Sequence, residues 1–151
     1  MLRTRINEAY KSAMKQKETL AVSTLRLIQA ALKDRDIAAR SNGNIDGISD
    51  DEILSLLQSM IKQRRDSVEA FEKGGRIELA QQEAEEIGII QRFLPAQLTP
   101  EEMITAIDDI IVAAHATTLK DMGKVMSALK ERFTGQMDFS KASSVVKSKL
   151  G

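Results

Sequence analysis

Cysteine is absent from this chain of 151 residues, which excludes disulfides, thiolate zinc sites, iron–sulfur clusters and cysteine nucleophiles together. Long apolar runs are absent too, since none approaches the roughly 18 residues that a membrane-spanning helix needs. The N-terminal sequence MLRTRINEAYK carries charge but lacks the apolar stretch of a secretory signal. These absences predict a cytoplasmic protein that does not use a membrane as a partner.

Aromatic residues are scarce as well, at 3% of the chain, whereas an all-β sandwich normally uses more of them. No run of alternating polar and apolar residues is long enough to indicate a strand. Apolar residues instead recur at intervals of three and four almost throughout the chain, which is the period of an amphipathic helix. The predicted fold class is therefore all-α.

Four longer helices are expected in the first two-thirds of the chain. The apolar stripes place them over residues 2–14, 20–39, 50–73 and 76–93. The segment RSNGNIDG (40–47) is rich in glycine and asparagine, and it predicts the loop before the third helix. Ser49 and Glu52 form a capping box that opens this third helix, and the pair Gly74-Gly75 ends it.

A boundary between two domains is expected at the first proline of the chain. The residue before Pro95 avoids helical geometry, so the fourth helix ends there. Thr99 then offers a capping side chain, with Pro100 at the first helical position, so a new helix starts. We therefore predict an N-terminal four-helix part over 1–94 and a smaller part of three short helices over 95–151.

No self-contained active site is visible in the sequence. The single histidine, His115, lies near a predicted helix end, where the helix dipole favours it without a catalytic role. Glycine-rich phosphate motifs are absent, and adjacent carboxylates on a helix point about 100° apart, so they do not share a site. Ser143-Ser144 with Lys141 lacks a glycine-rich oxyanion loop. We therefore predict no catalytic residue, no metal and no cofactor.

Charge is spread unequally along a chain whose net charge is zero. Residues 1–48 carry nine lysines and arginines against five acids, whereas residues 49–98 carry six against ten. A basic first third suggests a polyanion as the partner. The alternative is that the basic third simply faces the acidic third within the fold.

Cationic residues line up on the first two predicted helices. On the second helix they recur every seven residues, opposite the apolar stripe, as Arg26, Lys33 and Arg40. On the first helix they are Arg3, Lys11 and Lys15. Each set predicts a line of positive charge that can meet phosphates, and Asp36 interrupts the second line. The alternative is an ordinary solvated helix face.

Arg64 differs from its basic neighbours because it falls within the apolar stripe of the third helix. It lies four residues after Met60 and four before Val68, whereas Lys62 and Arg65 belong to a surface row. A guanidinium in an apolar stripe must pair with a carboxylate or extend out to water. Arg64 is therefore expected either to lock two helices together or to line a groove at a helix crossing.

Four segments of the chain carry a resemblance to a known family. They are 23–27 (STLRL), 61–67 (IKQRRDS) with 71–76 (FEKGGR), 93–98 (FLPAQL) and 120–126 (KDMGKVM). In this order and at these spacings they resemble the YqeY-like proteins of the GatB/YqeY family, over essentially the whole chain. The resemblance implies a helical protein whose smaller C-terminal part is similar to the tail of the B subunit of the tRNA-dependent amidotransferase.

That amidotransferase converts Glu-tRNA(Gln) or Asp-tRNA(Asn) to the amide with glutamine as nitrogen donor, and its tail is associated with tRNA. The resemblance therefore implies an accessory protein. Its partner would be tRNA itself, or an enzyme that handles tRNA, namely an amidotransferase or an aminoacyl-tRNA synthetase. With the charge pattern, the RNA-binding candidates are Arg3, Lys11, Lys15, Arg26, Lys33, Arg40, Lys62, Arg65 and Lys124. Two alternatives stay open: a component of a carbon–nitrogen ligase with glutamine as amido-N-donor, and a module that binds only protein through a groove around Arg64.

Overall fold

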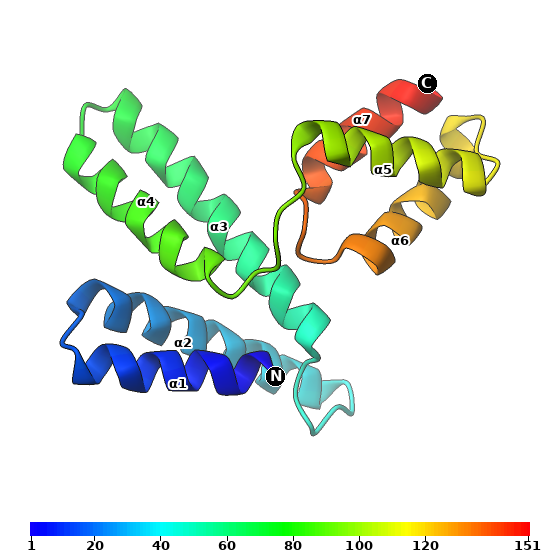
Figure 1. The fold of residues 1–151 in the computed structure, drawn as a ribbon. Helices are drawn as coiled ribbons and strands as arrows, with labels where there is room; N and C mark the ends of the chain where they lie inside the picture. Colours follow the sequence, from blue (N-terminus) through cyan, green and yellow to red (C-terminus); the bar gives the residue numbers. More distant parts are fainter. The chain divides into compact units, whose positions relative to one another are not determined.

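The computed structural model describes all 151 residues, and they form two compact helical units, Met1–Leu94 and Pro95–Gly151 (Figure 1). The first unit contains α1 (Leu2–Lys15), α2 (Thr19–Ser41), α3 (Asp50–Lys73) and α4 (Ile77–Gln91). The second contains α5 (Pro100–Ala113), the short 3-10 helix η1 (Leu119–Asp121), α6 (Met122–Phe133) and α7 (Phe139–Leu150). The structure has no strand, so the prediction of an all-α fold with four helices followed by three shorter ones is confirmed.

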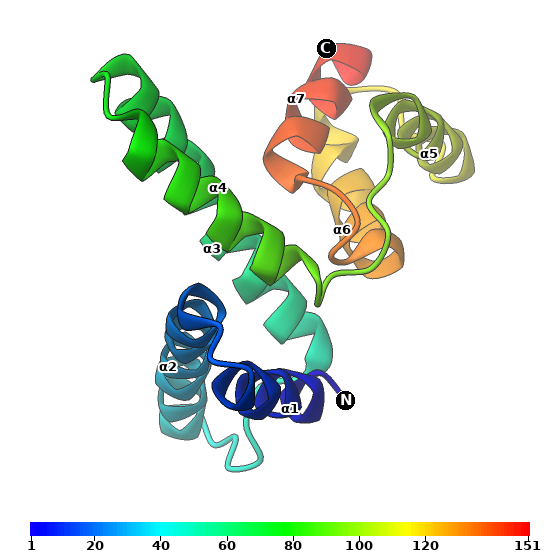
Figure 2. The ribbon, with the colours of Figure 1, turned by 60° about the vertical axis from the view of Figure 1, so that its left-hand side comes forward.

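Two antiparallel helical hairpins make up the first unit, α1 with α2 and α3 with α4 (Figure 1, Figure 2). The helix α2 also packs on α3 and α4, so both hairpins share one hydrophobic core. Its fully buried side chains are Ile6, Ile28, Ile53, Leu57 and Ile90. Burial of such a side chain stabilises a fold by roughly 1.5–3 kcal/mol, so this core is what holds the two hairpins together.

The helix ends follow the signals in the sequence to within two residues. The helix α4 ends at Gln91, two residues before the end expected from the apolar stripe. The Ser49 side chain accepts from the backbone N–H of Glu52, and the Thr99 side chain does the same from Glu102, so both predicted helix starts are capped. The helix α2 runs to Ser41, two residues into the segment expected as a loop. The chain does not turn until Gly43, which takes the positive φ of +89° that a side chain disfavours.

The second unit encloses a separate small core. The side chains of Ile107, Val125, Leu129, Ala142 and Val146 are fully buried in it. An ion pair of 2.7 Å between Lys149 and Asp108 links α7 to α5. Nowhere in the structure is a helix both long enough and apolar enough to cross a membrane.

Candidate functional site

Side chains of α1 and α2 meet in three polar contacts along one side of their hairpin. We call these contacts the α1–α2 seam, and they are Tyr10 with Arg26 at 2.9 Å, Asn7 with Gln29 at 3.1 Å, and Arg3 with Asp36 at 2.7 Å. The helices are antiparallel, so contacts further from the connecting turn lie earlier in α1 and later in α2. The seam therefore reaches from the middle of the hairpin to its open end.

The Arg3–Asp36 contact closes the open end of the hairpin. Both terminal nitrogens of Arg3 donate to the Asp36 carboxylate at 2.7 Å, and one also donates to the carbonyl of Ile48 at 3.1 Å. The N–H of Ile48 donates to the same carboxylate at 2.9 Å. The hydrogen bond from Arg3 is the main cause that lowers the pKa of Asp36 to about 2. One carboxylate therefore joins α1, α2 and the segment before α3.

Glycine is required where the backbone passes this ion pair. Gly47 has a φ of +90°, and a Cβ atom there would lie 2.6 Å from a terminal nitrogen of Arg3 and 2.9 Å from the Asp36 carboxylate. Both distances are shorter than any ordinary contact. The loop between α2 and α3 is therefore fitted against the side chains of Arg3 and Asp36.

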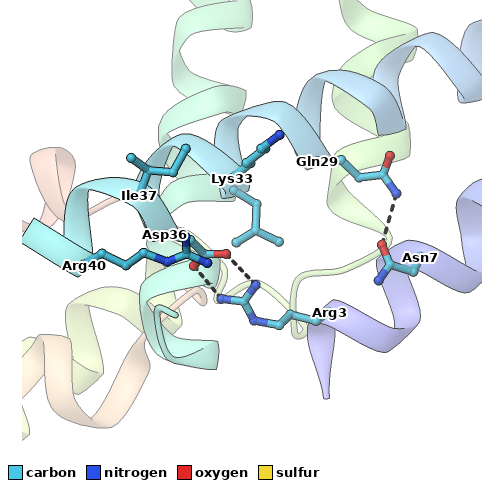
Figure 3. Close-up of a pocket in the computed structure, with 8 residues that line it drawn as sticks. Arg3, Asn7, Gln29, Lys33, Asp36, Ile37 and Arg40 are labelled. Atoms are coloured by element: carbon cyan, nitrogen blue, oxygen red, sulfur yellow. Dashed lines mark hydrogen bonds and ion pairs between the residues drawn. The ribbon is translucent and has the colours of Figure 1, made fainter. Parts of the chain in front are cut away.

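A pocket of about 310 Å³ opens on the seam, between the start of α1 and the second half of α2 (Figure 3). Three cations line it, Arg3, Lys33 and Arg40, against one carboxylate, Asp36. Because Arg3 and Asp36 neutralise each other, the pocket carries an excess of two positive charges. Figure 3 shows Arg3 reaching from α1 to the carboxylate, and the nearby charge of Arg40 also helps to lower the Asp36 pKa. We call this site the seam pocket.

The remaining lining of the seam pocket is half polar and half apolar. The amides of Asn7 and Gln29 meet at one side, where Gln29 donates to the Asn7 carbonyl oxygen at 3.1 Å (Figure 3). Leu32 is 8% exposed and belongs to the core, whereas Ile37 is 50% exposed. The pocket thus offers excess positive charge, amide donors and acceptors, and aliphatic surface in one place.

Not all of the predicted cations on the first hairpin are available to a ligand. Lys33 and Arg40 are exposed and lie on one face of α2, and the fold brings Arg3, from the other predicted line of charge, beside them in the seam pocket. Arg26 instead bonds Tyr10 and lies 5.8 Å from the centre of its ring, so it helps to hold the hairpin. Two further candidates, Lys11 and Lys15, are exposed on α1, outside the seam pocket.

The other basic candidates lie on other helices. Lys62 and Arg65 are exposed on α3. In the second unit, the Lys124 ammonium donates to the carbonyl of Ala114 at 3.0 Å, at the C-terminal end of α5. A cation there satisfies a carbonyl that the helix leaves unpaired, so Lys124 has a structural task.

The structure pairs Arg64 with Glu86 of α4, at 3.1 Å between Nε and Oε2. The two side chains are 13% and 10% exposed, and Arg64 also donates to the carbonyl of Met60 at 3.2 Å. Burial and the neighbouring Glu86 raise the pKa of Glu83, which lies beside this pair. The arrangement links α3 to α4, and it corresponds to the helix-locking role rather than to an open groove.

The polar partners in the seam were not singled out from the sequence. Asn7, Tyr10 and Gln29 belong to no recognisable motif. Whether their side chains come into contact depends on the register of α1 against α2. The connection from α1 to α2 is only three residues long, Gln16 to Glu18, which makes the two helices an antiparallel hairpin. Counting outward from that turn could have paired these positions. The structure gathers no three histidine, aspartate or glutamate side chains in a way that could hold a metal ion.

The sequence matches the profile of one family, described as "Yqey-like protein", over residues 3–150. Several fungal relatives carry the name "Altered inheritance of mitochondria protein 41, mitochondrial". The one from Lachancea thermotolerans is 33% identical over 84 residues, which are 56% of this chain and 43% of the relative. The one from Pyrenophora tritici-repentis is 27% identical over 135 residues, 85% of this chain and 71% of the relative.

A third relative of that name, from Eremothecium gossypii, is 32% identical over 91 residues, which are 60% of this chain and 48% of the relative. The matched part of this chain thus spans less than half the length of two of the three relatives.

Proposed function

The chain belongs to the YqeY-like protein family, and from that premise we propose that it is an accessory protein that binds tRNA through the basic side of its α1–α2 hairpin. The observation that carries the proposal is the excess of two positive charges in the seam pocket. Cations that are exposed and lack an internal carboxylate partner are what a phosphate backbone can use.

Four exposed cations of the hairpin support this reading: Lys11, Lys15, Lys33 and Arg40. Asp36 neutralises Arg3, and Arg26 keeps its charge but is directed towards Tyr10 by their hydrogen bond, so we count fewer contacts than the two lines of charge in the sequence predicted. Each phosphate contact contributes roughly −0.7 to −0.9 to the slope of log K against log salt, so four contacts give a slope of about −3. Recognition of this kind reads the shape and charge of RNA rather than its bases.

The proposal is tested by measuring binding of a tRNA transcript between about 50 and 200 mM salt. The double variant Lys33→Glu/Arg40→Glu should weaken binding at least tenfold and make the salt slope shallower. The matched control is Lys141→Glu/Lys147→Glu, which changes the charge equally at exposed positions of α7. An equal loss of affinity in both variants would show that only the net charge of the protein matters. An affinity that does not change with salt concentration would contradict the proposal.

The proposed function also bears on partners and location. The protein partners that fit it are enzymes that handle the same tRNA, an amidotransferase or an aminoacyl-tRNA synthetase. A partner that stays bound through nuclease and high salt would instead indicate a module that binds protein only. The relatives are named as mitochondrial proteins, so we propose an aqueous compartment that contains tRNA, either the cytoplasm or the mitochondrial interior.

The alternative function is a component of a carbon–nitrogen ligase with glutamine as amido-N-donor. It rests on the resemblance to the amidotransferase tail, and it would require partner subunits that bring the nucleophile and the nitrogen donor. Its direct test is whether partner subunits that bind this chain amidate a charged tRNA when the chain is present and fail to do so when it is absent.

A further inference from the structure

We propose that the seam pocket binds a terminal phosphate monoester, the group carried by a mononucleotide or by the 5′ end of an RNA. The RNA source of this group rests on the proposed function, whereas the mononucleotide source does not. The inference names which part of a nucleic acid enters the pocket and which side chains hold it.

Charge favours a terminal phosphate over an internal one. A phosphate monoester carries about −1.5 to −2 charges at neutral pH, because its second pKa is about 6. A phosphodiester within a strand carries one charge. The excess of two positive charges from Lys33 and Arg40 therefore matches the monoester, since Asp36 and Arg3 already neutralise each other.

The side chains of the seam pocket divide into fixed and available groups. Arg3 is held by three hydrogen bonds to Asp36 and Ile48, so it forms a rigid wall of the pocket. Lys33 and Arg40 lie three residues before and four residues after Asp36 on α2, so they approach the ligand from either side of that carboxylate. Guanidinium and ammonium groups are the usual donors to phosphate oxygens, the first as a fork and the second as a point charge.

The size and the remaining lining fit a nucleotide rather than a bare ion. A volume of about 310 Å³ is at the lower end of small-molecule sites, which run from roughly 300 to 1,000 Å³. Ile37, half-exposed, offers an aliphatic surface for a sugar or a base. The amides of Asn7 and Gln29 can exchange their mutual hydrogen bond for bonds to ligand hydroxyls or ring nitrogens.

The test compares two short RNAs of one sequence, one with a 5′-phosphate and one with a 5′-hydroxyl, bound to the full chain at low salt. The 5′-phosphate should raise the affinity about tenfold, and AMP should compete with that RNA whereas adenosine should not. In Lys33→Gln/Arg40→Gln the ratio between the two RNAs should fall to within twofold. The control Lys11→Gln/Lys15→Gln loses the same charge outside the pocket, so it should weaken both RNAs and keep their ratio.

The outcomes separate this inference from the proposed function. RNA that binds equally with either 5′ end, or a ratio that survives Lys33→Gln/Arg40→Gln, overturns the inference and leaves tRNA binding in place. AMP that binds and is lost in that variant, with no binding of either RNA, supports the pocket and overturns tRNA binding. If neither AMP nor either RNA binds, both the inference and the proposed tRNA binding are overturned. Circular dichroism of both variants, whose changed side chains are exposed, verifies that the helices are intact.

Discussion

Replacement of Arg64 by alanine should destabilise the first unit far more than replacement of Arg65. Arg64 and Glu86 are 13% and 10% exposed, so removal of the guanidinium leaves a carboxylate without a counter-charge inside the protein. Breaking a buried pair in this way costs about 3–5 kcal/mol. Arg65 is exposed on the same helix, and its loss should cost roughly 0–1 kcal/mol.

The assay for these variants can observe the first unit alone. Tyr10 is the single tyrosine of a chain without tryptophan, so its emission during urea unfolding reports the unit that contains α1–α4. With a slope near 1.5 kcal/mol per molar urea, Arg64→Ala should lower the midpoint by roughly 2–3 M and leave the slope unchanged. Equal midpoints for Arg64→Ala and Arg65→Ala would refute the claim that the Arg64–Glu86 pair locks α3 to α4.

One further variant distinguishes a stranded charge from simple loss of packing. The double variant Arg64→Leu/Glu86→Leu should recover most of the lost stability, because no buried charge remains. If the double variant is as unstable as Arg64→Ala, packing rather than charge is responsible.

The remaining predictions concern the open end of the hairpin and catalysis. Because the pKa of Asp36 is lowered to about 2 in the folded state, its stabilisation is present above about pH 4 and is lost as the pH falls towards 2. Asp36→Asn should therefore cost roughly 1–2 kcal/mol at pH 7, after a discount for partial exposure, and progressively less below pH 4 in urea titrations. Gly47→Ala should lower the free energy of unfolding by about 1–3 kcal/mol more than Gly43→Ala. Both glycines have a positive φ, but a Cβ atom at Gly43 meets nothing within 4 Å. Equal losses of stability in the two variants would mean that the loop moves aside. The isolated chain should show no glutamine hydrolysis or tRNA amidation above a mock preparation, and turnover abolished by one substitution in this chain would show otherwise.

Local signals in the sequence account for most of the fold. The three- and four-residue period of the apolar side chains and the capping boxes at Ser49 and Thr99 depend only on neighbours along the chain, so they could be predicted. The helix α2 extends two residues beyond the predicted Ala39, because Arg40 and Ser41 fit a helix as well as a loop.

The roles of the basic residues depend on contacts between helices, which the sequence does not specify. A seven-residue spacing shows that Arg26, Lys33 and Arg40 share a face, but not that Arg26 meets Tyr10 across the hairpin. The place of Arg64 in the apolar stripe predicted that it either pairs with a carboxylate or extends out to water. Which acid supplies it, Glu86, follows from the way α4 lies on α3.

The central claim, that tRNA binds on the basic side of the α1–α2 hairpin, is tested most directly by nuclear magnetic resonance. A tRNA transcript would be titrated at low salt into the ¹⁵N-labelled full chain. We predict that the largest changes fall on α1 and on residues 29–40 of α2, including the side-chain amides of Asn7 and Gln29, and that they fade as salt is added. Changes confined to residues 95–151, or changes that do not depend on salt, would contradict the account.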